Sequence, residues 1–138
     1  MPPVLLDVGS GSGILSLAAL LLGAERAVCL DTDPVAVEAT RANADANGLG
    51  DRVDARAGSL PAEATERFPL VVANLVASVL VELAPRLATH AEMGATVLAS
   101  GIIDRRASEV VAAFNDVGLA VRERIEDDEW VSLRAERA

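Results

Sequence analysis

Short apolar runs alternate along the chain with longer segments in which apolar residues recur at helical spacing. The short runs have the length and composition of buried strands, and they cover residues 4–8, 27–30, 53–57, 70–73 and 95–100. The longer segments predict helices at residues 14–22, 34–47, about 76–87 and 110–117. Pro85 should bend or split the third helix, because proline lacks the amide hydrogen that a helix interior needs. Strand–helix alternation of this kind predicts an α/β fold with a doubly wound, mostly parallel, Rossmann-like sheet.

The C-terminal segment departs from this alternation. Residues 119–126 and 129–133 predict two strands of a hairpin, with Asp127 and Asp128 at its turn. The hairpin would add an antiparallel strand to the sheet, and its charge run at residues 123–129 fits a solvated edge. Trp130 has two possible positions, in the core or over the sheet end near a site, and the core is the favoured one.

Composition limits the class of protein. The 138 residues suit one domain, residues 1–138, and 51% of them are hydrophobic although only 2% are aromatic. The formal net charge of −9 disfavours direct nucleic-acid binding, because phosphate neutralisation needs a cation-rich face. The lone cysteine, Cys29, lies in an apolar run and is expected to be buried, and no His/Cys cluster indicates a metal site. Charged residues interrupt the longest apolar stretch and no basic segment opens the chain, so we expect a cytoplasmic protein without a membrane span.

A glycine-rich turn follows the first predicted strand and carries the first candidate site. Gly9, Ser10, Gly11 and Gly13 lie between a buried strand and an apolar helix, and glycines there let the backbone approach a ligand closely. The dinucleotide fingerprint requires a glycine where this chain has Ile14, which argues against an NAD-dependent oxidoreductase domain.

Acidic residues at the ends of the first two strands accompany this turn. Asp31 ends the second strand, where a carboxylate can accept both hydroxyl protons of a ribose, and Thr32 beside it belongs to the same candidate site. Asp33 precedes Pro34 and is better explained as a helix N-cap. Asp7 lies one residue before the end of the first strand, and the alternative to a ligand role is that it caps the turn.

Asn74 follows the fourth strand and is the candidate catalytic residue. Its amide has one acceptor and two donors, which could position an amine nucleophile or a cofactor. The alternative is that Asn74 is the N-cap of the helix that begins near Leu75. The single histidine, His90, is expected at a helix end or on the surface.

Several of these motifs resemble the ribosomal protein L11 methyltransferases, a family of class I S-adenosylmethionine-dependent enzymes. The matching segments are residues 7–13, 71–85, 98–103 and 129–131. The resemblance implies the class I methyltransferase fold, S-adenosyl-L-methionine as cofactor, and N-methylation of amino groups in a protein partner such as ribosomal protein L11. It further implies that Asp7 orients the loop and the methionine amino group of the cofactor. Ser59 stands where many methyltransferases have an aspartate for the adenine amino group, and a loop serine without a ligand is the alternative there.

The resemblance also implies parts that this sequence does not contain. The family carries an N-terminal substrate-recognition domain and a segment upstream of the first strand, so we expect a catalytic domain truncated at its N-terminus that lacks the most N-terminal helix. A sheet face left bare in this way would favour self-association. A non-catalytic module of the same fold, binding cofactor or partners, stays open as an alternative to an active enzyme.

Overall fold

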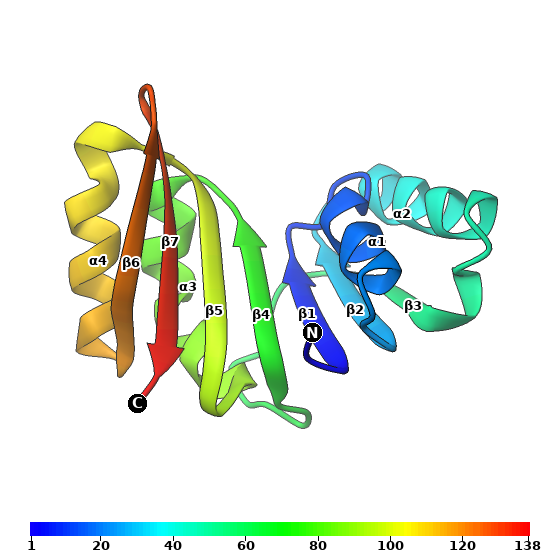
Figure 1. Ribbon diagram of the computed structural model, residues 1–138, viewed down its shortest axis with the longest axis horizontal. Helices are drawn as coiled ribbons and strands as arrows, with labels where there is room; N and C mark the ends of the chain where they lie inside the picture. The colour runs from blue at the N-terminus through cyan, green and yellow to red at the C-terminus, as the bar shows by residue number, and fades with distance from the viewer. The chain divides into compact units, whose positions relative to one another are not determined.

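A computed structural model describes residues 1–138, which divide into two compact units, Met1–Leu60 and Pro61–Ala138 (Figure 1). In the first unit the elements follow the predicted alternation. They are β1 Val4–Val8, α1 Ile14–Leu21, β2 Arg26–Asp31, α2 Pro34–Ala46, the 3-10 turn η1 Gly50–Arg52 and β3 Val53–Ala57. The strands are parallel in the order β3-β2-β1, so β2 is paired on both sides. Apart from the half-buried Val4, the apolar residues of β1 and β2 are buried, which explains their nearly continuous hydrophobic sequence.

Local signals set the helix ends in this unit. The Asp33 side chain accepts a hydrogen bond from the Val35 amide at 2.9 Å, and Pro34 is the first residue of α2. This confirms Asp33 as an N-cap. α1 is apolar on all sides: it buries Leu17 and Leu20 but leaves Leu21, with 72% of its surface exposed, in solvent. Cys29 is buried, as predicted.

The second unit contains the parallel pair β4–β5 and the antiparallel hairpin. Its elements are β4 Phe68–Asn74, α3 Ala77–His90, β5 Ala91–Ile103, the 3-10 turn η2 Asp104–Arg106, α4 Ala107–Asp116, β6 Leu119–Asp127 and β7 Trp130–Arg137. The strand order is β4-β5-β7-β6, with β7 antiparallel to both neighbours. The helices α3 and α4 pack against each other (Figure 1). The predicted α/β fold with parallel strands and a C-terminal antiparallel hairpin is therefore confirmed.

Some predicted boundaries in this unit are wrong. Pro85 does not split α3, which continues unbroken from Ala77 to His90, so of the two predicted effects of this proline only a bend stays open; Pro85 itself is exposed. β5 begins directly after α3, at Ala91, rather than at residue 95, with a register shift in its pairing with β4. The hairpin turn lies at Asp128 and Glu129, one residue later than predicted, and Asp128 takes a positive φ of 54° there.

Two side-chain positions also differ from expectation. Trp130 is 51% exposed at the start of β7, so the favoured position in the core is wrong. His90 is the last residue of α3, as one interpretation had it, but it is buried rather than on the surface. Its Nδ1 lies 2.8 Å from the carbonyl oxygen of Arg86, which gives this buried ring nitrogen a hydrogen-bond partner at the end of the helix.

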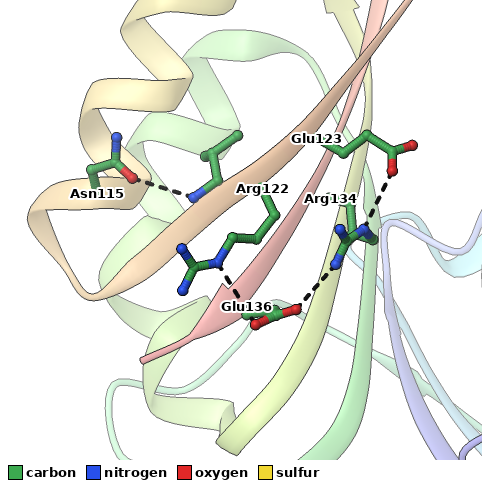
Figure 2. Close-up of polar contacts among 6 residues, drawn as sticks. Asn115, Arg122, Glu123, Arg134 and Glu136 are labelled. Carbon is green, nitrogen blue, oxygen red and sulfur yellow. Dashed lines mark hydrogen bonds and ion pairs between the residues drawn. The ribbon is translucent and has the colours of Figure 1, made fainter.

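The predicted solvated edge of the hairpin is confirmed, because residues 122–130 are all exposed. Figure 2 shows Glu136 between two guanidinium groups, at 3.7 Å from Arg122 and 3.1 Å from Arg134. Arg134 also lies 3.6 Å from Glu123 on the neighbouring strand. The Asn115 side chain accepts a hydrogen bond from the amide of Val121 at 3.3 Å, which ties the end of α4 to β6 (Figure 2). No helix of the chain is long and apolar enough to cross a membrane.

Candidate active site

The glycine-rich turn is fastened to the end of β2 by its backbone. The amides of Gly9 and Ser10 both donate to the carbonyl oxygen of Leu30, at 2.8 and 3.1 Å. The Gly13 amide donates to the Ser10 carbonyl, and Gly13 is the N-cap of α1 with a φ of 83°. The turn is thus a rigid strand-to-helix connection whose position relative to β2 is set by hydrogen bonds.

Asp31 connects three parts of the first unit. Its Oδ2 accepts from the Gly11 amide and its Oδ1 from the Asp33 amide, each at 2.9 Å. Its own carbonyl accepts from the amide of Gly58 at 2.8 Å, which brings the loop after β3 to the same place. A carboxylate oxygen has two lone pairs, so each oxygen of this partly exposed side chain can still accept a ligand hydroxyl.

The glycines of the turn serve different purposes. A Cβ at Gly11 would meet no atom within 4 Å, so this position faces open space. A Cβ at Gly13 would lie 2.9 Å from Cγ2 of Thr40 on α2, which is too close. Gly11 therefore leaves room beside the turn, whereas Gly13 allows the turn to pack against α2.

Side chains of α2 hold the outer side of the turn. The Thr40 hydroxyl is buried, donates to the Gly11 carbonyl at 3.0 Å and lies 3.3 Å from the Ser10 hydroxyl. Asn43 donates to the Ser12 carbonyl at 2.8 Å. Both the hydroxyl and the backbone amide of Ser10 are thus used inside the protein, which leaves only the second lone pair of its carbonyl for a ligand. Thr40 was not recognised from the sequence, because a threonine in a polar helix carries no signal of its own.

Asp7 is buried, with 1% of its surface exposed, and its two oxygens differ. The hydroxyl of Ser16, in the first turn of α1, donates to Asp7 Oδ2 at 2.7 Å, whereas Asp7 Oδ1 is buried without any hydrogen-bond partner. Burial raises the pKa of Asp7 to about 6; the Ser16 hydrogen bond lowers it and the negative charge of Asp31 raises it. The partner of the carboxylate lies in α1, so the structure does not support Asp7 as a cap of the glycine turn.

The remaining predicted cofactor residues are at the surface. Thr32 follows β2 and is exposed, next to Asp31. Ser59 follows β3, is exposed, and stands between Gly58, which is tied to Asp31, and the buried Leu60. The first unit therefore brings together Asp7, the turn, Asp31, Thr32 and the loop that carries Ser59.

Asn74 lies in the second unit, at the carboxyl end of β4. It is exposed and paired in register with Ser100 on β5. A Cβ at Gly101 would be only 2.6 Å from Oδ1 of Asn74, so the glycine leaves space for this amide. The N-cap of α3 is Val76, without a side-chain cap, so Asn74 is not the N-cap. Gly101 belongs to the segment 98–103 quoted above, but only the fold shows that it supports Asn74.

A pocket of about 220 Å³ opens next to Gly101 in the same unit. Trp130, Val76 and Ile103 contribute apolar walls, and Arg105 lies at its edge. Trp130 pairs with Ile103 at the end of β5, and its predicted position over the sheet end near a site stays a prediction. Its exposed indole and the neighbouring aliphatic groups can receive a flexible side chain with an apolar stem.

Comparisons with known proteins agree on one family. The family described as "Ribosomal protein L11 methyltransferase (PrmA)" matches residues 3–138. A ribosomal protein L11 methyltransferase of Pelotomaculum thermopropionicum is 44% identical over 94% of this chain, and one of Heliobacterium modesticaldum is 41% identical over 96%. The chain spans only 42% of the length of each of these relatives.

Solved structures show the same likeness. The crystal structure of ribosomal protein L11 methylase from Lactobacillus delbrueckii subsp. bulgaricus has a TM-score of 0.93 and 31% identity, over 99% of this chain and 71% of that one. An RNA methyltransferase from Salinibacter ruber, solved with S-adenosyl-L-homocysteine, has a TM-score of 0.77 and 27% identity, over 98% of this chain and 80% of that one.

Proposed function

Because this chain belongs to the ribosomal protein L11 methyltransferase family, we propose that it binds S-adenosyl-L-methionine and takes part in methylating amino groups of ribosomal protein L11. The observation that carries the proposal is the pairing of the open glycine turn with the doubly anchored carboxylate of Asp31. A ribosomal target would place the protein in the cytoplasm.

The residues of the first unit fit the cofactor. The open space at Gly11 admits a ligand against the backbone, and Asp31 keeps lone pairs for the two hydroxyls of a ribose. The unpartnered Oδ1 of Asp7 accepts a hydrogen bond from the amino group of the methionine moiety, directly or through one water. Ser59, on the loop joined to Asp31, reaches the adenine edge through its hydroxyl or backbone.

The chain's share of the chemistry is positioning. The bound cofactor supplies a methyl group on a positively charged sulfur, which is already a good leaving group. Asn74 then needs only to orient the attacking nitrogen, and its Oδ1 can accept a hydrogen bond from a neutral amine. The pocket walled by Trp130 and Val76 holds the stem of the substrate side chain and limits water around the nitrogen.

Calorimetric titration of the 138-residue chain tests the cofactor proposal. We expect S-adenosyl-L-homocysteine to bind and NAD not to. Asp31→Ala should weaken binding more than tenfold, because hydrogen bonds to a charged group contribute about 1.5–3 kcal/mol each. Asp33→Ala is the matched control: it removes the N-cap of α2 but should leave the affinity within about threefold of the parent, since caps contribute to helix stability. Equal affinities of the Asp31→Ala variant and the parent would remove Asp31 from the site, and preferential binding of NAD would refute the cofactor assignment.

A transfer assay addresses turnover. With ribosomal protein L11 as methyl acceptor, Asn74→Ala should lower kcat by about tenfold or more while S-adenosyl-L-homocysteine affinity stays unchanged. If the parental chain binds the cofactor but transfers no methyl group, it acts as a binding module and the proposed turnover fails.

A further inference from the structure

We infer that Ser16 is a positioning residue, which orients the carboxylate of Asp7 so that Oδ1 is left for a hydrogen-bond donor of the ligand. Ser16 is completely buried, in the first turn of α1, and its hydroxyl points at Asp7 Oδ2 over 2.7 Å. The other oxygen, Oδ1, has no partner within the protein. A buried acceptor without a donor is destabilising, so the arrangement is completed only when a donor from the ligand binds.

A second buried group is hydrogen-bonded to the Ser16 hydroxyl. The thiol of Cys29, on β2, donates to Ser16 Oγ at 3.2 Å. Burial raises the pKa of Cys29 to about 12, so the thiol keeps its proton and can donate it to Ser16. Ser16 Oγ thus accepts from Cys29 and donates to Asp7 Oδ2, the nearer of these two partners. The order Cys29, Ser16, Asp7 is therefore a one-way chain of hydrogen bonds that ends on Oδ2.

The same bond keeps Asp7 available as an anion. Burial favours the neutral acid, and the nearby negative charge of Asp31 on β2 acts in the same direction. The Ser16 hydroxyl opposes both, and it is the largest influence that lowers the pKa of Asp7. Without it, Asp7 would hold its proton at higher pH and would attract a cationic amino group less well.

Carbon-detected NMR of the Asp7 carboxyl in the ligand-free chain tests the inference without any cofactor. We expect Ser16→Ala to move the titration midpoint of Asp7 upward by roughly one unit. Ser16→Thr keeps the hydroxyl and should restore the parental midpoint. Cys29→Ala is the matched control, because it removes a neighbouring buried group but leaves the Ser16 hydroxyl, and it should shift the midpoint much less. An unchanged midpoint in Ser16→Ala would overturn the inference; if that variant does not fold, Ser16→Cys, with its weaker donor, should show a smaller upward shift, and no shift there would overturn it equally.

The link to the ligand rests on the proposed function and has its own readout. The affinity for S-adenosyl-L-homocysteine, measured at pH 6 and pH 8, should fall more at pH 6 than at pH 8 in Ser16→Ala compared with the parent. The same loss at both pH values would show that Ser16 does not act through the charge of Asp7. Absence of binding to the parental chain at pH 8 would instead refute the proposed function, while the NMR shift would still establish the positioning of Asp7.

Discussion

The glycine turn after β1 and the β6–β7 hairpin use polar groups in opposite ways. Around the turn, a few hydroxyls and carboxylates are buried or half-buried and are held mostly at 2.7–3.0 Å. On the hairpin, ion pairs such as Arg134–Glu136 and Arg124–Glu126 are short, but their side chains keep roughly 40–60% of their surface in water. A buried hydrogen bond cannot be replaced by water when it is lost, whereas an exposed pair can, so the turn should dominate stability and function despite its fewer charges.

The largest expected effect is a loss of stability on substitution of Gly13, which should exceed the loss on substitution of Gly11 in the same turn. Both Gly11 and Gly13 have positive φ, which costs a residue with a Cβ about 1–2 kcal/mol. Gly13→Val would also force its side chain against Thr40, whose position is fixed by its bond to the Gly11 carbonyl. We expect Gly13→Val to lower the free energy of unfolding by about 2–5 kcal/mol, since overpacking adds roughly 1–3 kcal/mol to the backbone strain.

Gly11→Val is the matched variant for this prediction. It should lose only about 1–2 kcal/mol, because its Cβ meets open space, and yet it should abolish binding of S-adenosyl-L-homocysteine. Urea denaturation and calorimetry measure the two effects. Equal stability losses in the two variants would contradict the packing argument, and a folded Gly11→Val that binds at parental affinity would refute the assignment of the turn.

The contrast between the two regions also shows what the sequence could predict. Glycine, proline and aspartate at helix ends are local signals, so the turn, the N-cap at Asp33 and the end of α2 near Gly48 could be read directly. Ser16 and Thr40 could not, because their roles depend on which elements become neighbours. Asp31 was predicted as a ligand residue, but its part in tying Gly11 and Asp33 together needed the fold.

Trp130 shows that a hydrophobic side chain can also be predicted wrongly. An indole in a chain so poor in aromatic residues suggests a core position, because hydrophobicity alone does not tell inward from outward on a strand. In the hairpin Trp130 pairs with Asp127 beside the turn and with Ile103 at the end of β5, where little protein is left to cover it. The strands β5 and β7 also extend beyond their predicted ranges. Backbone hydrogen bonds to a neighbouring strand continue past the apolar residues, which are all that the sequence pattern shows.

The second prediction concerns pH and the buried carboxylate of Asp7. Its pKa is about 6 in the folded chain against 3.8 for the unperturbed group, so the folded state holds the proton more tightly. Its contribution to stability is therefore fully present below pH 4 and is lost as the pH rises to about 6. Relative to Asp7→Asn, which has no such titration, the parent should lose about 3 kcal/mol of unfolding free energy over this interval. Urea denaturation of both proteins between pH 4 and 7 measures it, and a difference independent of pH would contradict it.

The third prediction removes one buried hydroxyl on the outer side of the turn. Thr40→Val keeps the shape of the side chain but leaves the Gly11 carbonyl and the Ser10 hydroxyl without their partner. We expect a loss of about 1–2 kcal/mol in unfolding free energy. Thr40→Ser, which keeps the hydroxyl, is the control for the bond itself, and it should retain most of the turn's hydrogen-bond contribution. A neutral Thr40→Val would show that water replaces the threonine there.

The smallest effect is expected on the hairpin, at a charge that has two ion-pair partners. Glu136 on β7 lies between Arg122 and Arg134, and Arg134 continues to Glu123 (Figure 2). Because these side chains are about half exposed, Glu136→Gln should change the unfolding free energy by less than about 1 kcal/mol, and 0.5 M salt should reduce the difference further through screening. The amide oxygen of glutamine can still accept a hydrogen bond from Arg134, so the variant removes the negative charge but keeps this hydrogen bond. A loss as large as that of Thr40→Val would mean that the paired charges act as one cooperative network, and the contrast between the turn and the hairpin would then fail as an account of where this chain's stability lies.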